Sequence, residues 1–91
     1  MTEINKLLSE RQSTHGDFTC NAEASQALKR IIDTHYNAPA QLSDVQRESL
    51  DAICAKIARI ITGDPNHKDS WDDVAGYATL AANRITIKET E

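Results

Sequence analysis

The sequence has few of the residues that build a large core or a covalently braced one. Only 4% of its 91 residues are aromatic, and it contains two cysteines, two prolines and three glycines. The hydrophobic fraction is 40%, but much of it is alanine, so the core must be thin. We therefore expect a single helical domain over residues 1–91, marginal alone, that self-associates or docks on a protein partner.

Long apolar runs are also lacking, and this excludes a membrane partner, because a spanning helix needs about 20 apolar residues. The N-terminus has no apolar region of the kind found in signal peptides. Cys20 and Cys54 form no CxxC motif. These features predict a cytoplasmic protein with reduced cysteines in its core.

The charge excludes further classes. The formal net charge is -4, which argues against generic nucleic-acid binding through phosphates. There is no Walker loop, nucleophile elbow or glycine-rich dinucleotide loop. The histidines form no helical pair of the kind that holds zinc. No catalytic residue can therefore be assigned, and whether the chain is an enzyme stays open.

Apolar residues at helical spacing are present throughout. They predict helices over about 2–12, 19–36, 43–62 and 69–85. Ser43 with Gln46 is typical of a capping box, and Gly63 is placed to end the third helix. The fold prediction is all-α: a small four-helix bundle-like domain centred on the antiparallel hairpin of 43–62 and 69–85, with the short first helix packing across one end.

Each hairpin helix has an apolar stripe that predicts the core. On the third helix the stripe consists of Leu50, Ile53, Cys54, Ile57, Ile60 and Ile61. On the fourth helix it consists of Trp71, Val74, Ala75, Ala78, Ala81, Ala82 and Ile85. We also expect Phe18 to turn inward and anchor the loop before the second helix.

The faces opposite these stripes are unusual for solvated surfaces. The third helix places two alanines between Glu48 and Arg59, and the fourth aligns acids with an aromatic and a leucine. Gly76 in mid-helix costs about 1 kcal/mol relative to alanine, which predicts a close approach by a backbone or a ligand. The candidate face consists of Glu48, Ala52, Ala55, Arg59, Asp69, Asp73, Gly76, Tyr77 and Leu80.

Charged residues on this hairpin allow two interpretations. Glu48, Asp51, Asp69 and Asp73 are metal candidates, because carboxylates on two antiparallel helices can hold Mg²⁺. Asp69, Asp72 and Asp73 also suit the start of the fourth helix, where acids complement the helix dipole. Lys56 and Arg59 can clamp a phosphate or form ordinary salt bridges with the aspartates of the fourth helix. No cofactor is expected unless Mg²⁺ is bound.

Three motifs resemble those of a family. The patterns Glu10-Arg11-x-x-x-His15-Gly16-Asp17, Lys56-x-x-Arg59-Ile60 and Asp69-x-Trp71-x-Asp73-x-Ala75-Gly76-Tyr77 together look like small all-helical proteins of tailed phages and prophages. The resemblance covers most of the chain. It implies a phage or prophage origin, a bacterial cytoplasm and an all-helical fold, and it adds His15 and Asp17 to the candidate site.

A second likeness concerns the MazG-type all-α nucleotide pyrophosphohydrolases. Asp73-Val74-x-x-Tyr77 is similar to their second motif, with Ser70 where that motif has an acid. The first motif would be Glu48-x-x-Asp51, preceded by Arg47 where an acid is usual. This likeness implies Mg²⁺-dependent chemistry on a nucleotide.

Two functions therefore stay open. One is a small binding or regulatory protein that acts by protein–protein interaction, as a homo-oligomer or on a host system. The other is Mg²⁺-dependent binding or hydrolysis of a nucleotide or another phosphate ligand. The candidate binding residues for both are His15, Asp17, Glu48, Lys56, Arg59, Asp69, Asp73, Gly76, Tyr77 and Leu80.

Overall fold

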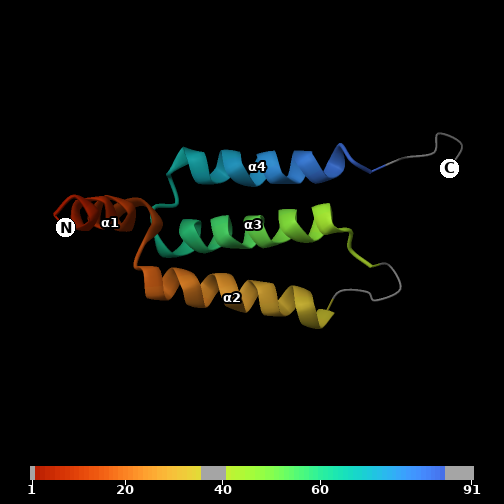
Figure 1. Cartoon of the computed structure of the whole chain (residues 1–91), viewed down its shortest axis with the longest axis horizontal. Coiled ribbons are helices and arrows are strands. Elements are labelled where there is room, and N and C mark those ends of the chain that lie inside the picture. The colour runs from red at the N-terminus through yellow and green to blue at the C-terminus, as the bar shows by residue number, and fades with distance from the viewer. Residues whose placement is uncertain (1, 36–40, 86–91) are drawn as a thin grey trace, which may run out of the picture.

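The computed structural model describes residues 2–35 and 41–85, and these form four α-helices without a strand. They are α1 (Thr2–His15), α2 (Phe18–His35), α3 (Asp44–Thr62) and α4 (Lys68–Ala82), shown in Figure 1. The predicted all-α class and the central α3–α4 hairpin are confirmed. No helix among the described residues has the length and apolarity needed to cross a membrane.

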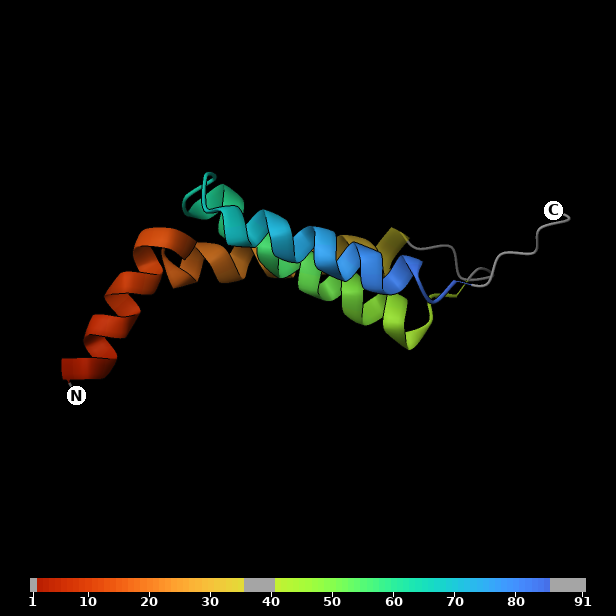
Figure 2. The same ribbon diagram turned by 90° about the horizontal axis from the view of Figure 1, so that it is seen from above.

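Helix α3 is the middle of one layer of three helices. It packs against α2 on one side and α4 on the other, whereas the described residues of α2 and α4 do not contact each other. Neighbouring helices in this layer run antiparallel (Figure 1). Helix α1 lies beyond one end and leaves the layer at an angle (Figure 2). The bundle is therefore open on both broad sides of α3.

Local sequence signals explain most helix ends. The capping box is confirmed: the Gln46 N–H donates to Ser43 Oγ at 3.1 Å, and the Ser43 N–H donates to Gln46 Oε1 at 2.9 Å. Gly63 ends α3, as expected, with its N–H donating to the Arg59 carbonyl. Helix α4 ends at Ala82, so Ile85 lies beyond the helix that was expected to include it.

The connection between α1 and α2 corrects three expectations. Helix α1 continues to His15 instead of ending at 12, and Gly16, at φ +81°, then turns the chain. Helix α2 starts at Phe18 because the Asp17 carboxylate accepts a hydrogen bond from the Cys20 N–H at 3.2 Å and caps the helix. Phe18 is 81% exposed, so it does not anchor the loop. The expected end of this helix at Tyr36 lies outside the described residues.

The core is small and lies on α3. Among the described residues the buried hydrophobic side chains are Cys54, Ala58 and Ile60. Cys20 is exposed, contrary to expectation. In residues 2–35 and 41–85 the buried polar residues are three serines, one on each helix of the layer: Ser25, Ser49 and Ser70. Small side chains at these positions let the helices approach closely, but they bury little apolar area.

Ion pairs identify the sides of α3 that face its neighbours. Arg47 Nη2 pairs with Asp33 Oδ1 on α2, and Lys56 Nζ pairs with Asp73 Oδ2 on α4. At 3.6 residues per turn, Cys54 and Ala58 share the Arg47 side, whereas Ile60 shares the Lys56 side. Helix α3 is thus covered by α2 and α4 on two opposite sides. The rest of its apolar stripe falls between them, on one broad side of the layer.

The apolar residues of α2 and α4 extend the same broad side. Residues two apart on a helix point nearly opposite ways, so Ile31 and Trp71 lie away from the paired carboxylates of Asp33 and Asp73. Ile31 is 57% exposed and Trp71 55% exposed. We call this surface the open apolar face, and its residues are Leu28, Ile31, Leu50, Ile53, Ile57, Ile61, Trp71, Val74 and Ala78.

The open apolar face corrects the predicted core. Leu50, Ile53 and Ile57 are half-buried and Ile61 is 65% exposed, although all four belong to the stripe expected to be buried. Trp71 was likewise expected in the core. The physical reason is that no helix among the described residues packs over this side of α3.

Candidate functional site

The predicted site on the α3–α4 hairpin is occupied in part by an ion pair. Lys56 Nζ lies 2.9 Å from Asp73 Oδ2, and the Lys56 side chain is only 18% exposed. Of the two interpretations of Lys56, the salt bridge to an aspartate of the fourth helix is therefore confirmed. This lysine joins the two helices and is not presented to solvent as a free phosphate clamp.

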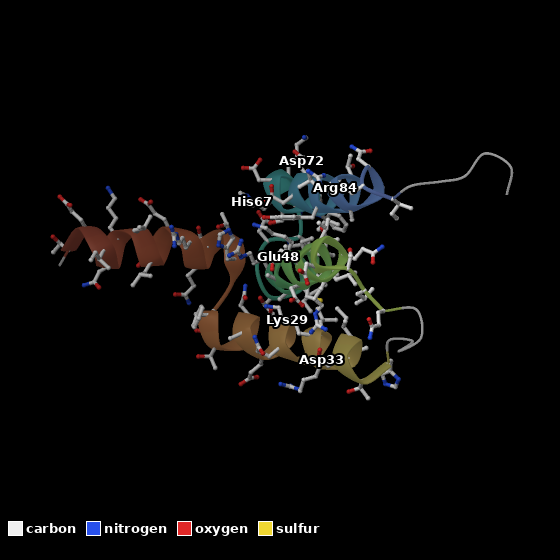
Figure 3. All side chains as sticks on the ribbon, turned by 45° about the vertical axis from the view of Figure 1, so that its right-hand side comes forward. Lys29, Asp33, Glu48, His67, Asp72 and Arg84 are labelled. Atoms are coloured by element: carbon white, nitrogen blue, oxygen red, sulfur yellow. The ribbon has the colours of Figure 1, made fainter. Side chains whose placement is uncertain are left out.

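The metal candidates do not come together. Asp51 accepts a hydrogen bond from Arg47 Nε at 3.3 Å, while Asp72 pairs with Lys68 one turn earlier at 2.7 Å. Glu48 and Asp69 are exposed. Within residues 2–35 and 41–85 no three His, Cys, Asp or Glu side chains are grouped so that they could hold a metal ion. Figure 3 shows Glu48 and Asp72 on different helices of the layer.

Gly76 does not mark a close approach. A Cβ atom built on Gly76 would meet nothing within 4 Å, so the expected approach of another backbone is wrong for the described residues, and a ligand against Gly76 stays a prediction. Gly76 is exposed on the outer side of α4. Of the other candidates on this face, Tyr77 is half-buried and Leu80 is 47% exposed.

A better formed site lies where the end of α1 meets the end of α3. A pocket of about 400 Å³ opens there, which is within the usual range for small-molecule sites. It brings the predicted candidates His15 and Asp17 together with Arg59, which lies far from both in the sequence. We call it the junction pocket, and its lining residues are Leu8, Arg11, Gln12, His15, Gly16, Asp17, Phe18, Asn21 and Arg59.

Backbone contacts hold this junction together. The Asp64 N–H donates to the Thr14 carbonyl at 2.9 Å. Thr62 Oγ1 donates to the Ala58 carbonyl at 2.7 Å and lies 3.3 Å from the His15 carbonyl. The same carbonyl accepts a hydrogen bond from Asn21 Nδ2 at 3.2 Å. The His15 carbonyl thus links α1 to α2, and the Thr14 carbonyl links α1 to the segment that follows α3.

The electrostatics of the junction pocket are cationic. Burial lowers the pKa of His15, and the positive charges of Arg59, His67, Lys56 and Arg11 lower it further. The His15 and His67 rings meet edge to face, with centroids 5.9 Å apart. Asp17 is the acid in the lining, and its carboxylate caps α2. The pocket therefore gathers positive charge next to the N-terminal end of a helix, where anions are favoured.

Sequence reasoning missed part of this pocket. Leu8, Phe18 and Asn21 line it, and His67 touches His15 from the start of α4. Leu8, Arg11 and His15 are three and four residues apart, a spacing that places them on one face of a helix. That signal was available in the sequence. The position of Arg59 beside them was not, because it depends on how α1 meets α3.

Comparison with protein-family models matched residues 1–85 to a domain of unknown function, DUF6378. The match covers all four helices and both surfaces described above. Comparison with curated proteins and with solved structures found no significant match.

Proposed function

This chain belongs to the DUF6378 family, a domain of unknown function, and we propose that it acts by protein–protein interaction through the open apolar face. The observation that carries the proposal is the exposure of that face. Ile31, Ile61 and Trp71 are each more than half exposed, and all nine residues of the face are uncharged and apolar. Contiguous apolar surface of this kind marks interaction sites.

The first occupant that we propose is a second copy of the chain. Stable domains are built from at least two packed layers, whereas the described helices α2, α3 and α4 form a single layer. A second copy related by a two-fold axis brings the same apolar surface, and because the face carries no charge, no like charges meet. The result is a two-layer assembly of six helices with a shared core.

The size of the face fits such a dimer. Helix α3 has 19 residues, so it is about 28 Å long at 1.5 Å per residue. Three helices at a spacing of about 9 Å span roughly 27 Å. This broad side of the layer then has a flat area on the order of 750 Å², comparable to the roughly 800 Å² of accessible surface that each partner buries in a standard interface.

The resemblance described above supplies the setting and role that we propose for this assembly. In this proposal the chain is a regulatory or binding protein in the cytoplasm of a bacterium that carries a phage or prophage. The alternative of Mg²⁺-dependent nucleotide hydrolysis has less support. The carboxylates of Asp51 and Asp73 are engaged by Arg47 and Lys56, and no described group of acids converges.

Light scattering coupled to size-exclusion chromatography tests the proposal. At about 100 μM we expect a dimer, because burying even three large apolar side chains contributes several kcal/mol. Ile31→Asp and Ile61→Asp should give monomers that remain helical. Leu80→Asp is the matched control, since Leu80 is also half exposed but lies on the opposite broad side, and it should leave the dimer intact.

Trp71 supplies a second readout. It is the one tryptophan of the chain and lies on the open apolar face. Its emission should shift to the red on dilution as the dimer dissociates, and it should be red-shifted at every concentration in Ile61→Asp. A monomeric parent at 100 μM, or a dimer that Leu80→Asp breaks and Ile61→Asp leaves intact, would refute the second-copy assembly.

A further inference from the structure

The junction pocket combines features that the proposed assembly does not use. Arg59 is two residues from both Ile57 and Ile61, so it points nearly opposite to the open apolar face. The pocket is lined by residues of α1, α2 and α3, which together place two guanidinium groups and an imidazole around one opening. A dimer formed through the open apolar face leaves it accessible.

Two arginines in the pocket have no carboxylate partner among the described residues. The ion pairs in residues 2–35 and 41–85 involve Arg47, Lys56 and Lys68 as cations, but not Arg11 or Arg59. Asp17 lines the same pocket, but its carboxylate accepts the Cys20 N–H and caps α2. The guanidinium groups therefore keep donors available for an added anion.

The lining also includes apolar surface beside the cations. The Phe18 ring is 81% exposed and Leu8 56% exposed, and both line the pocket. An exposed aromatic ring next to two arginines suits a ligand that has a flat or apolar group attached to its anionic head. Arginine forks match the planar edge of a carboxylate and, in the same bidentate way, two oxygens of a phosphate.

We propose that the junction pocket binds a small phosphate monoester, with Arg11 and Arg59 on the phosphoryl oxygens and the organic group against Phe18 and Leu8. His15 lines the same pocket and adds a ring nitrogen donor. Lys56 lies near but remains paired with Asp73, so it sets the local potential and does not contact the ligand.

The proposed ligand is a phosphate monoester, and three probes separate the contribution of its phosphate from that of its organic group. Inorganic phosphate has the anion alone, glycerol 3-phosphate adds a polar organic group, and phenyl phosphate adds a flat apolar one. We expect phenyl phosphate to bind several-fold more tightly than the other two, because stacking on an aromatic side chain adds to the charge-assisted hydrogen bonds.

The experiment is a titration of the ¹⁵N-labelled full chain, followed by amide and arginine side-chain NMR shifts in a phosphate-free buffer. Arg11→Gln and Arg59→Gln should each weaken phenyl phosphate binding by about 10-fold, as expected for losing a hydrogen bond to a charged group. Arg11 is exposed on α1, so its replacement leaves the packing of α3 intact. Phe18→Ala should remove the preference for phenyl phosphate over inorganic phosphate.

Arg30→Gln is the matched control, because it removes the same charge from an exposed position on α2 away from the pocket. It should bind the probes as the parent does. Bound phosphate should also raise the pKa of His15, since a nearby anion favours the imidazolium. No shifts at 20 mM phenyl phosphate, or an equal loss of affinity in Arg11→Gln and Arg30→Gln, would overturn the proposal while leaving the dimer proposal untouched.

Discussion

Gly16 and Gly63 face each other across the point where the end of α1 crosses the end of α3. A Cβ atom on Gly16 would lie 2.0 Å from the Thr62 carbonyl oxygen, and one on Gly63 would lie 2.4 Å from the Thr14 carbonyl oxygen. Both contacts are with backbone atoms, which no rotamer change can relieve. The two glycines therefore permit the crossing that forms the junction pocket.

Replacing either glycine with alanine should destabilise this junction. Gly16→Ala is also strained by its φ of +81°, so we expect a loss of about 2–4 kcal/mol in the free energy of unfolding, and Gly63→Ala a loss of about 2 kcal/mol. Urea unfolding followed by circular dichroism measures both.

Gly76→Ala is the matched control for these variants. Its Cβ would meet nothing, and alanine favours the helix, so unfolding should become harder by about 1 kcal/mol. If Gly16→Ala and Gly76→Ala changed stability alike, the backbone crossing of α1 and α3 would not be as described.

His15 should make stability depend on pH. Its pKa in the folded chain is lowered from 6.5 by burial and by Arg59, His67, Lys56 and Arg11. The unfolded chain then binds a proton more readily than the folded chain, so stability rises with pH in this range. The stability contributed by His15 should be fully present above about pH 7. It should be lost as the pH falls through 6.5 towards the lower pKa that His15 has in the folded chain.

The pH dependence is measured by urea unfolding at pH 7.5 and 5.5. His15→Gln should reduce the difference in the free energy of unfolding between these two conditions. His35→Gln, at an exposed position at the end of α2, should keep the difference seen in the parent. A His15→Gln variant with an undiminished pH dependence would assign the effect to another group.

The ion pair between Lys56 and Asp73 should stabilise the α3–α4 hairpin modestly. Lys56 is 18% exposed but Asp73 is 48% exposed, so water screens the pair in part. A double-mutant cycle with Lys56→Met and Asp73→Asn should give a coupling energy of about 0.5–1 kcal/mol. It should shrink in 1 M salt.

The pair of Lys68 and Asp72 serves as the reference for that cycle. Both of its side chains are more than half exposed, and it lies within one helix, so its coupling should be about 0.3 kcal/mol. Equal coupling in the two cycles would mean that the pair of Lys56 and Asp73 is no stronger between helices than an exposed pair within one helix.

Local signals in the sequence were read correctly where they act over a few residues. Ser43 and Gln46 form the expected capping box, and Gly63 ends α3 as expected. The end of α1 was placed too early because Ser13 and Thr14 look like a break. Their hydroxyl groups instead donate to carbonyls one turn back, which is compatible with a helix.

The candidate site was predicted only in part. His15, Asp17 and Arg59 do line one pocket, whereas Lys56 and Asp73 neutralise each other and Gly76 lies in open space. Periodicity gives the face of a helix on which a residue lies, but it does not say what covers that face. Tyr77 and Leu80 were therefore placed on the outer face of the fourth helix, but the sequence could not show what lies against that face.

The sequence by itself determined that the chain is helical, where α3 begins and ends and which faces are apolar, because these depend on spacing and on contacts within a few residues. Only the tertiary structure decided that α2, α3 and α4 lie in one row and that α1 crosses α3 at Gly16 and Gly63. An apolar stripe does not specify whether its cover is another helix of the same chain or a second molecule. Ile57 and Trp71 were thus correctly placed on the apolar stripes of their helices, yet they lie on a surface that the described helices leave open.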